Sequence, residues 1–250
     1  MQPTEAIILA GGFGTRLKKK ISQVPKPMAP IGDKPFLAYL LDYLVDFGIT
    51  HVILSVGYKW EVIRNQFGDR YKSARLSYAV EHEPLGTGGG MRAAMQLLEG
   101  DHTFILNGDT FFRVELNDLG AFYFAHEADI SMVVRRMNNF SRYGTVELQV
   151  CKVTGFREKQ QAKAGYINGG VYITSKFLFD RFNLPDKFSF EEDLLTKHLD
   201  ELNICAMNST GYFIDIGVPE DYEKAIRELP QMIQAGESLP DHPKWSRPRQ

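Results

Sequence analysis

The chain of 250 residues has little cysteine, little net charge and no long apolar run. Two cysteines, Cys151 and Cys205, are too few for a disulfide framework and predict a reducing compartment. A net charge of −2 gives no electrostatic basis for binding nucleic acid or an anionic membrane, so we expect neither as a partner. The most apolar segment, Phe36–Phe47, is interrupted by Asp42 and Asp46 and is shorter than the roughly 18 residues of a membrane span. Because the N-terminal residues also lack the basic stretch of a signal peptide, we expect a cytoplasmic protein.

Buried-strand and helical patterns alternate along the first half of the chain. Hydrophobic residues make up 44% of the sequence and charged residues 24%, which are ordinary values for a globular fold. Strands are predicted at residues 6–10, 52–56, 76–80 and 103–106, and helices at 36–47, 60–67 and 91–98. This alternation predicts an α/β fold with a Rossmann-like, mostly parallel sheet flanked by helices. Ligands of such sheets bind at the carboxyl ends of the strands, where Gly11 and Asp109 fall.

The second half predicts a mixed extension of the same sheet rather than a second domain. Strand patterns at residues 130–134, 145–150, 166–174, 204–207 and 212–216 follow one another with few helices between them, and helices are expected at 188–198 and 219–229. We therefore expect one domain over residues 1–235. Residues 236–250 form a polar, proline-rich tail that we expect to be flexible.

A glycine-rich segment directly follows the first predicted strand. Glycines at such a position let backbone amides turn toward an anion, most often a phosphate. The segment is neither a dinucleotide fingerprint, because Leu17 stands where the third glycine is needed, nor a P-loop, because Gly-Lys-Ser/Thr is absent. The alternative is a glycine-rich turn with no ligand. The candidate nucleotide-binding residues here are Leu9, Ala10, Gly11, Gly12, Gly14 and Thr15.

The run Gly-Gly-Phe-Gly-Thr-Arg-Leu at 11–17, followed by Pro-Lys-Pro at 25–27, resembles the signature of the sugar-1-phosphate nucleotidyltransferases. The resemblance covers residues 4–225 and implies a single nucleotidyltransferase domain that takes a nucleoside triphosphate and a sugar 1-phosphate. It assigns Arg16 to the β- and γ-phosphates and Lys26 to the phosphates near the reacting centre, as the catalytic residues. Lys19 stands where many members have proline, which concerns only the stiffness of the loop.

Two aspartates are candidate ligands of Mg²⁺. Asp109 ends the fourth predicted strand in Asn-Gly-Asp, which is also strong turn chemistry. Mg²⁺ prefers one or two carboxylates together with phosphate oxygens and water. The resemblance assigns Asp109 and Asp215 to the metal, with Val218 where the family motif around Asp215 often has threonine. A turn or helix-capping role is the alternative for Asp215.

A second glycine-rich loop, Glu-His-Glu-Pro-Leu-Gly-Thr-Gly-Gly at 81–89, resembles the family loop that surrounds the ribose and base. Glu81 falls where related enzymes place a base-reading side chain. A carboxylate only accepts hydrogen bonds, and guanine offers two adjacent donors, whereas uracil and thymine offer one donor between two acceptors. This favours GTP, and the alternative is a solvent-exposed Glu81. The nucleotide-binding candidates added here are Glu81, Pro84, Gly86, Thr87 and Gly108.

The second half supplies the residues that the resemblance assigns to the sugar phosphate. Lys159 is assigned to the 1-phosphate and Glu158 to sugar hydroxyls, while Asn168 lies in a strand motif that binds the hexose. Gly144 matches a glycine against which the sugar lies, and Glu191 matches an acid at the start of a helix near the sugar. Exposed charge and helix capping are the alternatives for Glu158 and Glu191.

The resemblance implies that a guanylyl group passes from GTP to a sugar 1-phosphate, with mannose 1-phosphate among the candidate sugars. One alternative is a non-catalytic relative that binds nucleotide or sugar phosphate and regulates a partner. Another is a sugar transferase, although such enzymes usually carry Asp-x-Asp where this chain has Asn107-Gly108-Asp109. The apolar segment Phe36–Phe47 and Trp245 in the tail are candidates for a contact between two copies of the chain.

Overall fold

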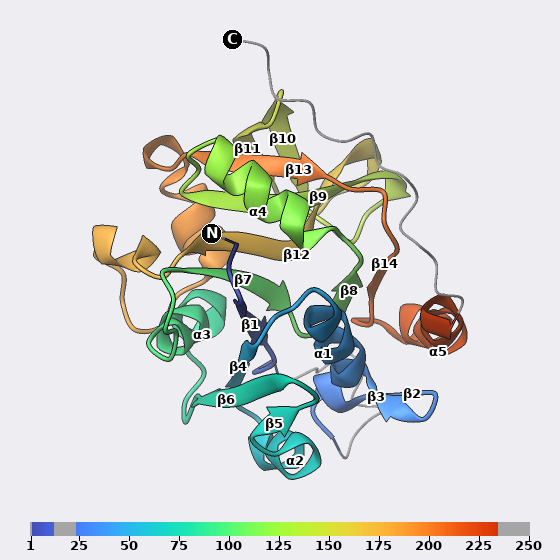
Figure 1. Ribbon diagram of the computed structural model, residues 1–250. Helices are drawn as coiled ribbons and strands as arrows, with labels where there is room; N and C mark the ends of the chain where they lie inside the picture. Colours follow the sequence, from blue (N-terminus) through green and yellow to red (C-terminus); the bar gives the residue numbers. More distant parts are fainter. Residues whose placement is uncertain (1, 13–23, 235–250) are drawn as a thin grey trace.

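The computed structural model describes residues 2–12 and 24–234, and within them the main sheet has ten strands in the order β10-β11-β13-β9-β12-β7-β1-β4-β6-β5 (Figure 1). The strands of the main sheet are β1 (Glu5–Leu9), β4 (His51–Val56), β5 (Arg70–Tyr71), β6 (Ala74–Val80), β7 (His102–Asn107), β9 (Ile130–Phe140), β10 (Thr145–Gln149), β11 (Lys152–Arg157), β12 (Ala162–Ser175) and β13 (Ile204–Asn208). Two small sheets pair β2 (Pro30–Ile31) with β3 (Lys34–Pro35) and β8 (Thr110–Phe112) with β14 (Phe213–Asp215).

The four strands β7, β1, β4 and β6 are parallel, and the two-residue edge strand β5 is antiparallel to β6. Strand β1 lies between β7 and β4 and is parallel to both, and β6 continues the sheet parallel to β4. Four of the five residues of β1 are buried, as expected of a strand with helices on both faces of its sheet. The four strands predicted from the first half of the sequence are therefore confirmed, and their carboxyl ends share one edge.

The second half is mixed, as the sequence predicted. Strand β12 is antiparallel to β7 on one side and to β9 on the other, and β13 is parallel to β9. Two elements in this half were not predicted. The turn after Val150 continues directly into β11, which pairs antiparallel with β10. Helix α4 (Leu116–Ala125) covers β9, β12 and β13.

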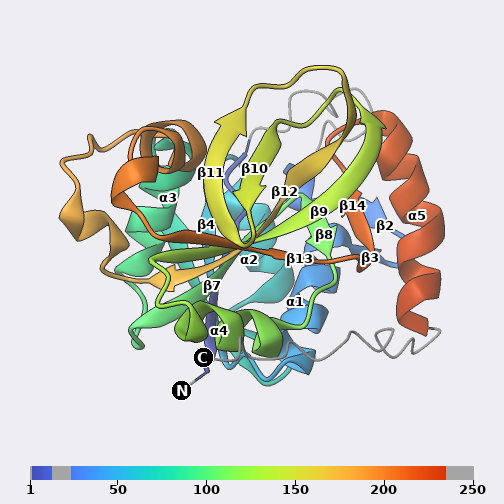
Figure 2. The ribbon, with the colours of Figure 1, turned by 90° about the horizontal axis from the view of Figure 1, so that it is seen from above.

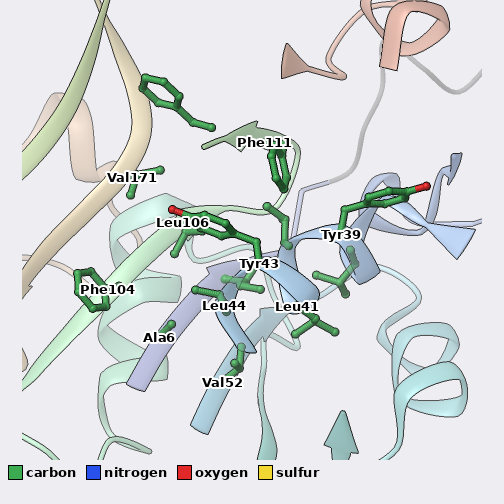
Figure 3. Packing of buried hydrophobic residues seen from close by; sticks show 14 of the residues in the cluster. Ala6, Tyr39, Leu41, Tyr43, Leu44, Val52, Phe104, Leu106, Phe111 and Val171 are labelled. Atoms are coloured by element: carbon green, nitrogen blue, oxygen red, sulfur yellow. The ribbon is translucent and has the colours of Figure 1, made fainter. Parts of the chain in front are cut away.

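Helices lie on both faces of the sheet (Figures 1 and 2). One face carries α1 (Phe36–Asp46), α2 (Trp60–Phe67), α4 and α5 (Pro219–Gln234), whose buried side chains share a core with the sheet (Figure 3). The other face carries α3 (Gly86–Met95) and the short helical segments η3 (Leu178–Arg181) and η4 (Phe190–Thr196). The short helical segments η2 (Lys26–Met28) and η5 (Leu199–Glu201) lie in connections.

Helix α1 packs inside the protomer, so its apolar surface is not available for a contact between two copies. Residues 36–44 are all buried, and Tyr39, Tyr43 and Leu44 contribute to the core drawn in Figure 3. Asp42 on the same helix forms ion pairs with Lys34 and Lys72. The expectation that this helix forms an oligomer contact is therefore wrong, because the sheet and the neighbouring helices cover it. Trp245 and the tail 236–250 lie outside the described residues.

Several helices have other bounds than predicted: the helix expected at 188–198 is the shorter η4, α1 ends one residue early at Asp46, and α3 and α5 differ further. Helix α3 begins at Gly86 and not after Gly90, so glycines form its first turn. A Cβ on Gly88 would lie 2.1 Å from Cε2 of Phe188, and one on Gly89 would lie 2.4 Å from the carbonyl oxygen of Asp186. Helix α5 continues past residue 229 with Pro230 inside it. The sequence pattern missed both because packing, rather than local propensity, sets these bounds.

Both cysteines are free thiols, Cys205 buried and Cys151 half-buried. Among the helices of the described residues, none has the length and apolarity needed to cross a membrane.

Candidate active site

A cavity of about 500 Å³ opens at the carboxyl ends of the four parallel strands. Each strand leads into residues that line it: β1 into Gly11 and Gly12, β4 into Gly57, β6 into Glu81, and β7 into Asp109. Glycines, a carboxylate beside them and a second carboxylate thus meet at one edge, although they are far apart in the sequence. This is where ligands bind in open α/β sheets.

Gly108, after β7, allows its backbone to approach the end of β1 closely. Gly108 donates its backbone N–H to the carbonyl of Leu9, and a Cβ on Gly108 would lie 2.5 Å from that oxygen. Leu9, Ala10, Gly11, Gly12 and Gly108, which are predicted to bind nucleotide, all line the cavity. Gly14, Thr15 and Arg16 lie outside the described residues.

Lys26 lies between the two predicted metal ligands. Its Nζ is 2.6 Å from Oδ2 of Asp109 and 3.8 Å from Oδ1 of Asp215, and the lysine side chain is only 10% exposed. The small β8–β14 sheet brings the aspartates together, because Asp215 pairs with Thr110 and the N–H of Ile216 donates to the carbonyl of Asp109. The three side chains therefore form one cluster, as the sequence predicted.

Asp215 takes part both in the local turn and in the charged cluster, which the sequence offered as alternative roles. Its Oδ1 accepts a hydrogen bond of 2.7 Å from the N–H of Gly217, which is the local turn role, and the same carboxylate faces Lys26. Burial, and next to it the negative charge of Asp109, raises the pKa of Asp215, while Lys26 acts in the opposite direction. A carboxylate in such a place is stabilised by added positive charge.

The donor set fits a magnesium ion only together with a substrate. In the described residues no three His, Cys, Asp or Glu side chains gather as a complete metal cage. Two carboxylates that repel each other beside an open, glycine-lined cavity instead fit Mg²⁺ when phosphate oxygens and water complete its shell.

Glu81 is half-buried and lines the cavity. The alternative of a solvent-exposed Glu81 is therefore not what the structure has. Its Oε1 accepts a hydrogen bond of 3.0 Å from Oγ of Ser55, and its Oε2 accepts one of 3.0 Å from the backbone N–H of Leu85. Pro84, Gly86 and Thr87 line the same cavity. The loop thus presents a fixed carboxylate beside the glycines of β1.

Thr87 joins the loop 81–89 to the element that carries Glu191. Its Oγ1 donates to Oε2 of Glu191 at 2.8 Å and accepts from the N–H of Phe190 at 2.9 Å. The carbonyl of Phe188 accepts from the N–H of Gly88 at 3.0 Å. These bonds span about a hundred residues of sequence and bring η4 to the cavity.

The other residues predicted for the sugar phosphate lie away from the cavity lining, and of the five only Glu191 is part of it. Glu158 and Lys159 are exposed after β11. Asn168 is half-buried, where its amide donates to the hydroxyl of Tyr172 and accepts from the N–H of Gly170. A Cβ on Gly144 would lie 2.6 Å from the carbonyl of Arg157, so strand packing alone already requires a glycine there.

The cavity residues at the end of β4 were not predicted from the sequence. Ser55, Gly57 and Tyr58 line the cavity at the end of this strand, and Asn107 lines it at the end of β7. The available signal was the strand pattern at residues 52–56, because the end of every central parallel strand is a candidate ligand position. A Gly-Tyr pair has no phosphate-binding signature of its own, so only the strand order reveals its place.

A Rossmann-like sheet with these groups at its carboxyl edge defines a nucleotide-binding α/β protein. The chain belongs to the nucleotidyl transferase family, whose pattern it matches over residues 5–232. It is 46% identical to D-glycero-alpha-D-manno-heptose 1-phosphate guanylyltransferase of Aneurinibacillus thermoaerophilus over 92% of this chain and 100% of the relative. It is 47% identical to the protein of the same name from Campylobacter jejuni, over 87% of this chain and 96% of the relative.

A solved structure gives the same comparison in three dimensions. HddC from Yersinia pseudotuberculosis, crystallised as a complex with GMP-PN, superposes with a TM-score of 0.79 at 35% identity, over 90% of this chain and 99% of HddC. Mannose-1-phosphate guanyltransferase of Schizosaccharomyces pombe is 33% identical, and this chain covers 62% of its length. The resemblance within the family, carried by residues 107–112, 188–192 and 214–222, also favours the heptose enzymes over the mannose enzymes.

Proposed function

We propose that the protein transfers a guanylyl group from GTP to a sugar 1-phosphate, with D-glycero-α-D-manno-heptose 1-phosphate as the sugar substrate, and forms GDP-sugar and pyrophosphate. The observation that carries this proposal is one cavity lined by a fixed carboxylate, Glu81, and by Lys26 and Asp109, with Asp215 next to it at 3.8 Å from Nζ of Lys26. Two relatives with this activity in their names are 46% and 47% identical over most of the chain, which supports the choice of nucleotide and sugar.

The reaction needs no protein nucleophile. An oxygen of the sugar phosphate attacks the α-phosphorus of GTP, a new P–O bond forms, and the bond to pyrophosphate breaks on the opposite side. Negative charge spreads over the phosphoryl oxygens during such transfers, so catalysis depends on positioning and on positive charge. Lys26 is placed to stabilise the α-phosphate once a substrate and metal have replaced it as the counter-charge of Asp109.

Asp109 and Asp215 would hold Mg²⁺, which supplies positive charge to the nucleotide phosphates when bound. Gly11 and Gly12 after β1 line the same cavity, and backbone amides of such glycines can add positive potential at a phosphate. By the family motif we assign Arg16, which lies outside the described residues, to the departing pyrophosphate.

The base is read at Glu81. Ser55 and Leu85 each use one acceptor position of the carboxylate, and one position remains on each oxygen. Two adjacent acceptors match the N1–H and N2–H of guanine and repel the carbonyl oxygens of uracil and thymine. This arrangement favours GTP over the pyrimidine nucleotides.

The sugar is expected between Glu191 and the second half of the sheet. Glu191 lines the cavity, where Thr87 fixes one of its oxygens. Glu158 and Lys159 lie exposed after β11, outside the cavity lining. By the family motif we assign Lys159 to the incoming 1-phosphate, with Glu158, Asn168 and Gly144 around the sugar. A cytoplasmic location and a single domain over residues 1–235 stay predictions from the sequence.

The test is a matrix of four nucleoside triphosphates against heptose, mannose and glucose 1-phosphates with Mg²⁺, scored by release of pyrophosphate. We expect the fastest release with GTP and the heptose 1-phosphate. A clear preference for another nucleotide contradicts the role of Glu81, and a preference for mannose contradicts the sugar assignment. Isotope exchange between pyrophosphate and GTP must also occur, because its absence with every sugar phosphate would indicate a non-catalytic binding protein.

A further inference from the structure

A buried serine lies behind the carboxylate that is assigned to guanine. Ser55 is only 1% exposed and belongs to β4, while Glu81 begins the loop after the neighbouring strand β6. The register fixes both residues at the same edge, because Val56 pairs with Val80 and the N–H of Glu81 donates to the carbonyl of Val56. The Ser55 hydroxyl therefore meets the carboxylate from the protein side of the cavity.

The Ser55 hydroxyl donates its hydrogen bond to the Glu81 carboxylate. Its oxygen lies 3.0 Å from Oε1 of Glu81, and a carboxylate cannot donate, so the serine is the donor. A buried hydroxyl without a partner costs free energy, which favours this bond over an unpaired state. Since the N–H of Leu85 fixes Oε2, the two bonds together set both the position and the rotation of the carboxylate.

Two glycines provide the space that the carboxylate occupies. A Cβ on Gly11 would lie 2.8 Å from Oε1 of Glu81, and a Cβ on Gly90 would lie 2.7 Å from it and 2.8 Å from Oγ of Ser55. The carboxylate thus lies between the glycine turn of β1 and helix α3. Because these glycines place no side chain against Glu81, the hydrogen bonds of Ser55 and Leu85 are what fix its orientation.

We infer that Ser55 is a positioning residue for base specificity, which holds the Glu81 carboxylate so that its two free acceptor positions face N1–H and N2–H of guanine together. The inference rests on the proposed function, because it takes GTP as the substrate. Without the hydroxyl, Oε1 loses its anchor and the plane of the carboxylate can rotate about its terminal bond. One of the two contacts to guanine is then weakened, and the contact to the amino group distinguishes guanine from hypoxanthine.

The experiment compares GTP with inosine triphosphate (ITP), whose base lacks that amino group, in the parent protein and in Ser55→Ala. We expect the ratio of kcat/KM for GTP to that for ITP to fall about fivefold in the variant, the size of one hydrogen bond, through KM and with kcat retained. Ser131→Ala is the matched control, because Ser131 is also a buried strand serine and its Oγ has no partner among the described residues. It should leave the ratio unchanged.

A double-mutant cycle separates positioning from a general loss of packing. In the Glu81→Ala background, Ser55→Ala should no longer change the GTP to ITP ratio, because the side chain that Ser55 orients is absent. An unchanged ratio in Ser55→Ala alone, or the same fall in both backgrounds, overturns the inference. Failure of the proposed function is seen separately, since the parent protein would then not turn over GTP.

Discussion

Lys26 and Asp109 form an ion pair of 2.6 Å in the lining of the cavity at the carboxyl ends of the parallel strands, although 83 positions separate them in the sequence. Lys26 also lies 3.8 Å from Asp215, so one ammonium group faces two carboxylates. The lysine balances the acid pair in the free protein, and phosphates and a divalent ion would change its partners when substrate binds.

Asp109→Asn should therefore lose activity without unfolding. The amide keeps the size of the side chain but removes the charge that we assign to Mg²⁺ binding, and we expect turnover to fall on the order of 10²–10³-fold. Release of pyrophosphate at saturating substrates measures the loss, and thermal unfolding checks the fold. Asp101→Asn is the control, because Asp101 pairs with Lys176 at the opposite edge of the sheet and is mostly exposed. Turnover of Asp109→Asn within about threefold of the parent would contradict the metal assignment.

Glu81→Gln should reduce the preference for GTP. The glutamine oxygen stays with the N–H of Leu85, so the amide nitrogen faces Ser55 and the base, where it meets a donor of guanine. We expect kcat/KM for GTP to fall about 10- to 100-fold relative to that for UTP, which offers a donor beside an acceptor. The same nucleotide series measures this ratio in Glu99→Gln, a surface variant at the Arg75 ion pair, which should leave it within about twofold. An equal loss for every nucleotide would mean that Glu81 does not read the base.

Thr87→Val should affect the sugar phosphate more than GTP. Valine keeps the shape of threonine but breaks the bonds to Glu191 and to the N–H of Phe190. Because Glu191 then loses its anchor, we expect KM for the sugar phosphate to rise about five- to tenfold, with a smaller change in KM for GTP. Thr87→Ser retains the hydroxyl and should restore the parent value. A rise in KM for GTP alone would show that Thr87 serves only the nucleotide.

Glu5→Gln should destabilise the protein in a pH-dependent way. Burial by itself raises the pKa of Glu5, but hydrogen bonds from Gly100, His51 and Glu99 outweigh it, so the net pKa lies below the ordinary 4.5. The charged form is thus favoured by folding. Its contribution to stability is present above pH 4.5 and is lost as the pH falls through the lowered pKa of the folded state.

At pH 7 we expect the free energy of unfolding to fall by about 1.5–3 kcal/mol in Glu5→Gln, since bonds to a buried charge are replaced. Urea unfolding at a series of pH values measures the difference, which should narrow as the pH drops below 4.5. Glu99→Gln, at an exposed ion pair, should cost less than about 1 kcal/mol. A difference for Glu5→Gln that does not depend on pH would show that packing, and not charge, is responsible.

Much of the fold could be predicted because its central strands are buried on both faces. Most residues of β1 and β4 are apolar, and a glycine follows the end of each strand. The hydrophobic pattern and the turn signal therefore indicate the same strand ends. Helix α2 was predicted with its observed bounds, Trp60–Phe67, because its apolar residues repeat at helical spacing. Strand β11 and helix α4 were missed, since a strand that pairs at the edge of a mixed sheet and a helix with aromatic residues on several sides carry weak periodic signals.

The candidate site divides in the same way. The phosphate-side glycines, Lys26, Asp109 and Asp215 were predicted from local motifs, and the structure brings those among residues 2–12 and 24–234 together. Ser55 and Tyr58 were not predicted, because neither lies in a motif and each reaches the cavity only through the place of β4 beside β1.

The sequence by itself determined the chemistry that is present: glycines where the backbone must approach a phosphate, a lysine and two aspartates, and a carboxylate before the second glycine loop. Only the tertiary structure decided which of these groups meet, and which have partners. The physical reason is that hydrogen bonds such as Ser55–Glu81 and Thr87–Glu191 join residues 26 and 104 positions apart. Their lengths depend on strand register and on the packing of α3 against η4, and no local pattern of residues encodes either.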